Sequence, residues 1–136
     1  MARGFRCIDE ELGWPGPPGW IGDFVQIDFG HRTGGALVAE YTGPDQALWV
    51  LVEDPVSYRV HDERELVAYW TQRAEENAPI AFAYELEESA YLIELREGVS
   101  GMIGTPLRHF LMGGQNACLE VIARNLPTIT SSRPGP

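Results

Sequence analysis

The chain has 136 residues, which is enough for one compact domain and too few for two ordinary ones. Twenty Asp and Glu residues against ten Lys and Arg residues give a formal net charge of −10, and 44% of the residues are hydrophobic. The hydrophobic content excludes a disordered chain, and the negative charge disfavours a general nucleic-acid binder or a protein of anionic membrane surfaces. A basic protein partner is favoured instead.

The amino end has neither the apolar core nor the cleavage site of a secretory signal, and no stretch approaches the roughly twenty apolar residues of a membrane span. We therefore expect a cytoplasmic protein. Its two cysteines, Cys7 and Cys118, lie far apart and outside any Cys-x-x-Cys pair, which favours free thiols in a reducing compartment.

Residues 1–22 are expected to form a Pro/Gly-rich N-terminal arm. Residues 13–22 contain three prolines and four glycines, which disfavour both a helix and a regular strand. Trp14 and Trp20 would fasten this arm to the domain.

Four strands are expected between this arm and the middle of the chain. Apolar residues alternate with polar ones over residues 24–29 and 36–42, which is typical of strands with one buried face. Residues 47–53 are apolar on both faces and so favour a central strand. A short strand follows at residues 56–60.

The hydrophobic period then changes to that of a helix. Asp62 followed by Glu65 is close to a capping box, and Leu66, Val67 and Trp70 fall on one apolar stripe. The pattern predicts an amphipathic helix over residues 62–77, which ends before Pro79.

Four further strands are predicted at residues 80–86, 89–95, 107–112 and 117–123. Residues 113–116 suit a hairpin turn that would place Met112 opposite Ala117 and His109 opposite Glu120. The expected fold class is α+β: one curled antiparallel β-sheet of about eight strands, four before and four after one amphipathic helix. It would form a single domain over residues 1–130, with residues 131–136 as a disordered tail.

Catalytic and metal-binding patterns are weak in this sequence. His31, His61 and His109 lack metal-ligand spacing, so we expect no metal site and no cofactor. Cys118 and His109 could lie on one hairpin, but the expected register separates them, and a cysteine inside a strand is usually inert. We therefore expect that the protein is not an enzyme.

The clearest surface pattern is acidic. Strand alternation predicts that the positions opposite the core face carry carboxylates that gather on one outer face. Tyr69 or Trp49 could add an aromatic anchor, and such a face would accelerate binding of a basic protein. An ordinary solvated surface is the alternative. The expected partner-binding residues are Glu40, Glu85, Glu94, Glu120 and Tyr69.

The segments YRVHDERELVAYW (58–70) and AFAYELEESAYLIEL (81–95) resemble the strand, capped helix and paired strands of small acidic immunity proteins. These proteins are encoded beside polymorphic toxins that bacteria deliver by contact-dependent or type VI secretion. The resemblance spans residues 56–123 and includes no invariant motif, so it assigns no site residue. It implies a monomer or weak dimer that binds one cognate toxin domain, often a basic nuclease or deaminase, and blocks its active site.

Two other functions fit the same features. One is an acidic dimeric secretion chaperone for an effector protein, which would expose apolar grooves. The other is a small ligand-binding domain or enzyme, with a pocket between helix and sheet near Trp49, Trp70, Tyr84 and His109.

Overall fold

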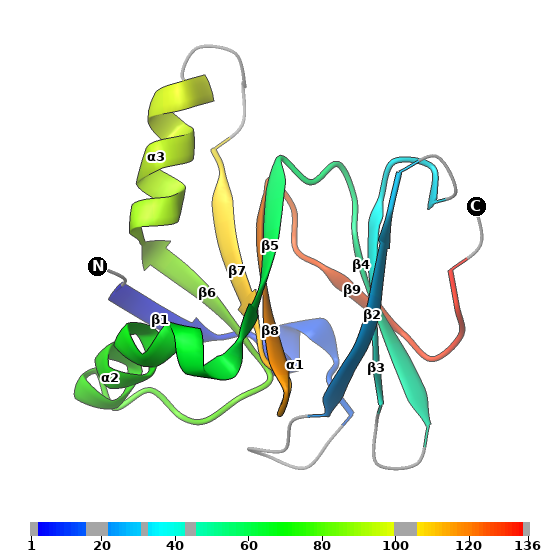
Figure 1. Ribbon diagram of the computed structural model, residues 1–136, viewed down its shortest axis with the longest axis horizontal. Coiled ribbons are helices and arrows are strands. Elements are labelled where there is room, and N and C mark those ends of the chain that lie inside the picture. Colours follow the sequence, from blue (N-terminus) through cyan, green and yellow to red (C-terminus); the bar gives the residue numbers. More distant parts are fainter. Residues whose placement is uncertain (1–2, 16–21, 31–32, 43–45, 100–105, 135–136) are drawn as a thin grey trace.

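Two antiparallel sheets and a layer of helices make up the computed structural model, which describes residues 3–15, 22–30, 33–42, 46–99 and 106–134 (Figure 1). The strands are β1 (Arg3–Cys7), β2 (Asp23–Phe29), β3 (Leu37–Thr42), β4 (Ala47–Val52), β5 (Ser57–Asp62), β6 (Ala83–Glu88), β7 (Arg108–Met112), β8 (Ala117–Ala123) and β9 (Thr128–Thr130). The helices are α1 (Asp9–Leu12), α2 (Val67–Glu75), α3 (Ala90–Val99) and the 3₁₀ segment η2 (Glu63–Leu66). Within these ranges, none of the helices combines the length and hydropathy of a membrane span.

The strands divide between a five-stranded sheet and a four-stranded sheet. The five-stranded sheet has the order β1-β6-β7-β8-β5, and the four-stranded sheet has the order β2-β3-β4-β9. All neighbouring strands are antiparallel. The α+β class is therefore confirmed, whereas the strands form two sheets where the sequence predicted one curled sheet.

The main hydrophobic core lies between the two sheets. Tyr41 and Val50 of the four-stranded sheet and Phe110 and Val121 of the five-stranded sheet are fully buried there. These residues alternate along their strands with residues that point the other way, because successive side chains of a strand face opposite sides.

The N-terminal segment is part of this core. Strand β1 pairs with β6, and Ile8 and Leu12 are buried between the sheets. The ring of Trp14 stacks on that of Phe82 with a centroid separation of 3.8 Å, which confirms that this tryptophan fastens the segment to the domain. Trp20 lies outside the described residues.

Helix α2 covers part of the other face of the five-stranded sheet. The expected helix at residues 62–77 is confirmed in the middle, but β5 extends to Asp62, and the first helical turn is the 3₁₀ segment η2. Leu66, Tyr69 and Trp70 pack against the sheet, whereas Val67, which the sequence placed on the apolar stripe, is 61% exposed. The tighter 3₁₀ turn changes which residues of the helix face the sheet.

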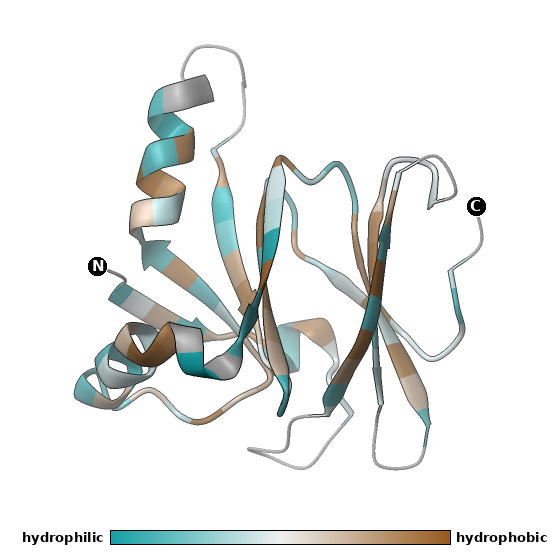
Figure 2. Cartoon of the chain, in the orientation of Figure 1, coloured by the Kyte–Doolittle hydropathy of each residue, from teal (hydrophilic) through white to brown (hydrophobic). Residues whose placement is uncertain are grey.

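Helix α3 occupies the segment where the sequence predicted a strand at residues 89–95. Tyr91, Leu92 and Leu95 face the sheet, and Glu94 is exposed, which is the spacing of a helix. The Ser89 hydroxyl accepts a hydrogen bond from the Leu92 amide at 3.0 Å and so caps the first turn. Figure 2 shows apolar and polar residues alternating along this helix.

The β7–β8 hairpin has a different register from the expected one. Met112 pairs with Leu119 and His109 with Ile122, a shift of two residues, and Ala117 and Cys118 pair only with β5, on the other edge of β8. A shift of two keeps each side chain on its face of the sheet.

The chain ends against the four-stranded sheet. Strand β9, which the sequence analysis did not predict, pairs with β4. Residues 131–134, expected to belong to a disordered tail, are among the described residues and follow β9. Within them, Arg133 Nη2 lies 3.5 Å from Asp28 Oδ2. Residues 135–136 lie outside the described ranges.

Candidate functional site

The structure brings together two of the five residues expected to bind a partner. Tyr69 extends from α2, and its hydroxyl donates a hydrogen bond of 2.8 Å to Glu120 Oε1 on β8. Glu120 is 0% exposed, so its expected place on an outer acidic face is wrong. It lies on the helix-covered face of the five-stranded sheet, beneath α2.

The other three glutamates lie on three different surfaces. Glu40 is on the outward face of the four-stranded sheet, and Glu94 is exposed on α3. Glu85 is on β6, where Arg108 donates hydrogen bonds of 2.7 and 2.8 Å to its carboxylate. Arg108, followed by Arg6, lowers the pKa of Glu85 against the opposing effect of burial. The predicted single face of four glutamates is therefore not formed.

Glu120 is the centre of a buried polar group that we call the Glu120 cluster: Arg59, His61, Tyr69, His109 and Glu120. Its Oε1 atom accepts hydrogen bonds of 2.8 Å from both Tyr69 and His109 Nε2. Its Oε2 atom accepts one of 2.7 Å from Arg59 Nε and lies 2.8 Å from His61 Nε2. Four side chains from β5, β7 and α2 thus surround one carboxylate.

These donors keep Glu120 ionised. Burial alone would raise the pKa of Glu120, but the hydrogen bonds from His109, Arg59 and Tyr69 outweigh burial and lower the pKa to about 2. Burial and the neighbouring Glu120 carboxylate raise the pKa of Tyr69, so this hydroxyl remains a donor. Glu120 and Arg59 therefore form an ion pair at neutral pH, and Tyr69 and His109 complete the hydrogen bonds to the carboxylate.

Ser89, His109 and Glu120 form a line that resembles a catalytic triad. Ser89 Oγ lies 2.6 Å from His109 Nδ1, and His109 Nε2 lies 2.8 Å from Glu120. However, all three side chains are fully buried, and the Ser89 hydroxyl also accepts the capping hydrogen bond of α3. With no access for a substrate and both ring nitrogens engaged, this line stabilises the packing of α3 on the sheet.

The solvent side of the Glu120 cluster is cationic and aromatic. The Arg59 guanidinium lies 3.9 Å from the ring centroid of Tyr91, and the Tyr91 hydroxyl lies 2.5 Å from Ser57 Oγ. The Arg59 side chain is 41% exposed. Sequence alternation could have found Ser57, Arg59 and His61, which share one face of β5, but it could not show that this face meets Glu120.

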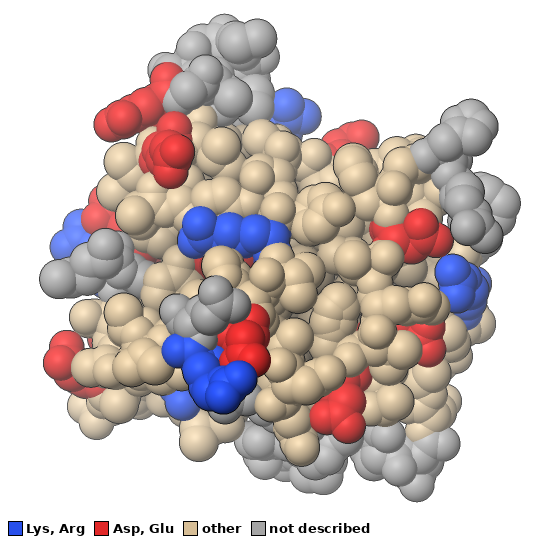
Figure 3. Space-filling model, in the orientation of Figure 1, with Lys and Arg blue, Asp and Glu red and all other residues tan. Residues whose placement is uncertain are grey.

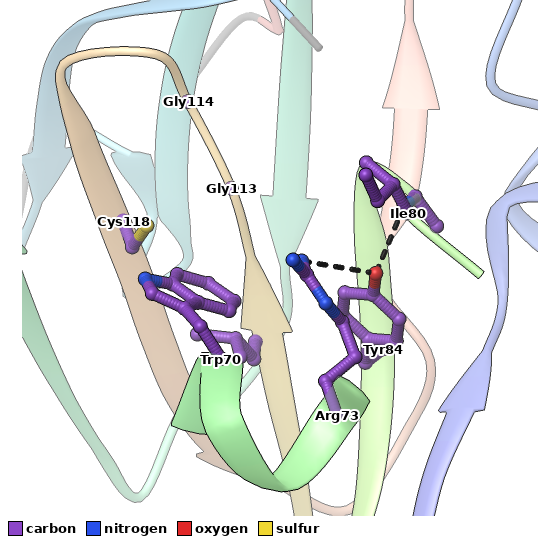
Figure 4. Close-up of a pocket in the computed structure, with 9 residues that line it drawn as sticks. Trp70, Arg73, Ile80, Tyr84, Gly113, Gly114 and Cys118 are labelled. Atoms are coloured by element: carbon purple, nitrogen blue, oxygen red, sulfur yellow. Dashed lines mark hydrogen bonds between the residues drawn. The ribbon is translucent and has the colours of Figure 1, made fainter. Parts of the chain in front are cut away.

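A cavity of about 300 Å³ lies between α2 and the five-stranded sheet (Figure 4). Trp70 and Tyr84, two of the four residues expected near a pocket, line it. Trp49 is on the four-stranded sheet, and His109 belongs to the Glu120 cluster, so neither contributes. The other side chains that line the cavity are Arg73, Ile80, Ala81, Leu111 and Cys118.

The outward face of the four-stranded sheet is acidic. Its four strands contain three carboxylates and no arginine. In the strand register, Glu40 lies opposite Trp49, and both alternate with core residues. Figure 3 shows acidic groups on this side of the molecule with one basic group beside them, and both acidic and basic groups over the helices and the five-stranded sheet. We call Asp23, Asp28, Glu40, Trp49 and Leu51 the acidic face.

Within the described ranges, no group of three or more His, Cys, Asp or Glu residues could hold a metal ion. His31 lies outside these ranges. No protein-family model, curated protein or solved structure matches the chain.

Proposed function

We propose that this protein is an immunity protein: it binds and neutralises a cognate secreted bacterial toxin domain, and the acidic face is its docking surface. The observation that carries this proposal is the charge of the four-stranded sheet, whose strands have three carboxylates and no arginine. The resemblance of residues 58–70 to the strand and capped helix of acidic immunity proteins supports the same function, whereas residues 81–95 form a strand and a helix where the resemblance implies paired strands.

Glu85 and Glu88 of the five-stranded sheet have internal partners. Arg3 pairs with Glu88 at 2.7 Å, and Arg108 pairs with Glu85 at 2.7 Å. These pairs are neutralised within the molecule and offer little to a charged partner.

Glu40 and Asp28 of the acidic face are less fully neutralised by internal partners. Glu40 accepts a hydrogen bond of 2.8 Å from Gln26, a neutral side chain. Asp28 has one long contact of 3.5 Å with Arg133. An unneutralised negative face attracts a basic protein and accelerates its association.

The acidic face also offers an aromatic side chain. Trp49 lies directly opposite Glu40 in the β3–β4 register and is half-buried. Tryptophan is enriched among the residues that contribute most to protein–protein affinity. A Trp beside carboxylates is suited to an interface in which charge guides the approach and apolar contact gives affinity.

The test is co-expression with the toxin domain encoded in the reading frame next to this chain. We expect the wild-type protein to restore growth of cells that produce this toxin, and to form a complex with it as a monomer or weak dimer by light scattering. Failure to restore growth and to bind would contradict the proposal. A stable dimer that binds only an unfolded segment of the partner would instead indicate a secretion chaperone.

The docking surface is tested by charge reversal. Asp23→Arg with Glu40→Arg should slow association with the toxin domain at least tenfold and reduce its salt dependence, because both changes reverse charge on the acidic face. Glu94→Arg with Glu97→Arg, two exposed reversals on α3, is the matched control and should have a smaller effect. The reverse ranking would exclude the acidic face as the docking surface.

A further inference from the structure

We propose that the cavity between α2 and the five-stranded sheet binds a small carboxylic acid with an apolar tail. Arg73 would bind the carboxylate, and Trp70, Ala81 and Leu111 would contact the tail. This site lies on the side of the five-stranded sheet away from the acidic face, so it is independent of toxin binding through that face.

The cavity is formed by side chains of α2 and of strands β6, β7 and β8. Trp70 and Arg73 extend from α2, while Tyr84, Leu111 and Cys118 come from three neighbouring strands of the sheet (Figure 4). Gly113 and Gly114 complete the wall without side chains. Its volume of about 300 Å³ is at the lower end of the range of small-molecule sites.

The interior of the cavity is apolar. Leu111, Ala81 and the ring of Tyr84 are buried and belong to the core cluster beneath α2. Ile80 lines the cavity and is 60% exposed. An apolar tail inserted here would remove part of the Ile80 side chain and the cavity wall from water, which is favourable in proportion to the apolar area covered.

Arg73 gives the cavity a positive group. Its guanidinium carbon lies 4.8 Å from the ring centroid of Trp70, and its Nη1 lies 3.5 Å from the Tyr84 hydroxyl. In the described part of the chain, no carboxylate lies within ion-pair distance of Arg73, whereas Arg59 and Arg108 each contact one. Arg73 therefore has donors to offer to an anion.

The surrounding contacts orient Arg73 before a ligand arrives. The Tyr84 hydroxyl donates to the Pro79 carbonyl at 2.5 Å and accepts from the Ala81 amide at 2.9 Å, so its position is fixed. Figure 4 shows this hydroxyl beside Arg73. The guanidinium is held between this hydroxyl and the Trp70 ring. A planar guanidinium fixed in this way suits two parallel hydrogen bonds to a carboxylate.

The chemistry of the cavity selects the ligand class. A cationic guanidinium disfavours an amine, and a single arginine with apolar walls provides too few donors for a phosphate. A monocarboxylate with an aromatic or aliphatic tail satisfies both parts of the cavity.

The experiment compares two probes of the same shape by isothermal titration calorimetry on the full chain. The probes are 4-phenylbutyrate and its neutral analogue 4-phenylbutan-1-ol. We expect the acid to bind the wild type about tenfold more tightly than the alcohol, as a charge-assisted hydrogen bond provides. Equal affinities, or no saturable binding of the acid at millimolar concentration, would overturn the proposal.

Variants then assign the preference to Arg73. Arg73→Leu should abolish the preference for the acid and leave binding of the alcohol within about twofold, because only the charge contact is lost. Arg96→Leu removes the same charge from the exposed surface of α3 and should keep the preference. A preference that persists in Arg73→Leu would overturn the proposal.

A measurement on the wild type does not depend on the folding of any variant. Intermolecular NOEs between the phenyl ring of 4-phenylbutyrate and the methyl groups of Leu111 are expected in the complex. NOEs confined to methyl groups other than those of Ile80, Ala81 and Leu111 would place the acid elsewhere and overturn the proposal. Neither result depends on the toxin, so this site can fail while the proposed function stands.

Discussion

The two sheets of this protein differ in how far their carboxylates are paired with arginines. The five-stranded sheet has arginines on β1, β5 and β7, and these pair with its own carboxylates. The four-stranded sheet has no arginine in any strand. Around Glu120 the five-stranded sheet is covered on both faces, where an unpaired charge would be costly, whereas no helix in the described part of the chain lies over the outward face of the other sheet (Figure 1).

Glu120 and Glu40 show the difference at the level of single residues. Glu120 accepts hydrogen bonds from three side chains, lies 2.8 Å from a fourth, His61, and has no exposed surface. Glu40 is partly exposed and bonds to a neutral amide. The comparison teaches that a carboxylate on a strand serves the fold when its face is covered and remains available to a partner when its face is open.

The largest expected effect follows from removing the buried charge. Glu120→Gln should lower the free energy of unfolding by about 3 kcal/mol, because Arg59 and the histidines lose their anionic partner inside the protein. Glu40→Gln, the matched change on the acidic face, should change it by less than about 0.5 kcal/mol. Urea unfolding of both variants measures this difference. Equal losses of stability would contradict the distinction between the buried Glu120 and the partly exposed Glu40.

Acid should destabilise the wild type through the same residue. The pKa of Glu120 is about 2 in the folded protein and higher when unfolded, so its contribution is complete above pH 4.5 and is lost as pH falls toward 2. The loss over this window should be about 3 kcal/mol at most, to which Glu85 adds because its pKa is also lowered. Unfolding measured between pH 2 and 5 should show a shallower decline for Glu120→Gln. Identical slopes for the variant and the wild type would contradict this role.

A smaller effect is expected where the two sheets meet. A Cβ at Gly114 would lie 2.7 Å from the Ala117 carbonyl oxygen and 3.1 Å from the Phe24 amide, so Gly114→Ala should cost about 2 kcal/mol. Gly113→Ala is the control, since its Cβ would lie 3.7 Å from the nearest atom, the Phe82 carbonyl oxygen. The melting temperature of Gly114→Ala should be several degrees below that of Gly113→Ala. A similar decrease in both variants would show that the close contact at Gly114 does not decide stability.

The smallest effect concerns the arginine beside the acidic face. Arg133→Gln should change stability by less than about 0.5 kcal/mol, because both partners of its 3.5 Å pair with Asp28 are partly exposed. The same change should speed association with a basic toxin domain, since it removes the positive charge beside Asp28. Slower association, measured by stopped-flow mixing, would contradict the role of the acidic face.

The sequence predicted much of the four-stranded sheet and the helix at α2. Strands β2 and β3 alternate, and β4, which is apolar on both faces, lies inside the sheet between β3 and β9, as expected. The pairing of β1 with β6 and the position of β9 were not predictable from local pattern, because they join segments that are far apart or very short.

Helix α3 was missed because its sequence fits two periods. Tyr91, Ile93 and Leu95 alternate as in a strand, whereas Tyr91, Leu92 and Leu95 have the spacing of a helix. The capping residue Ser89 was the signal that could have decided between them, since serine is favoured at a helix start.

The error over Glu120 has a physical cause. Alternation assigns residues to two sides of a strand but does not say which side meets solvent. In the five-stranded sheet both sides are cores: Leu119 faces the other sheet, and Cys118 faces α2. Glu120 therefore points away from the core between the two sheets and into the second core beneath α2.

The order of strands also constrains how the molecule is made. Strand β1 pairs with β6, which is synthesised much later. The four-stranded sheet is completed by β9, which follows all of its other strands in the sequence. The five-stranded sheet cannot close before β8 has been synthesised, and the four-stranded sheet cannot close before β9 has been synthesised. Folding is thus a late event dominated by distant pairings, which are slow to form and leave apolar strand faces open to aggregation while the ribosome is still at work.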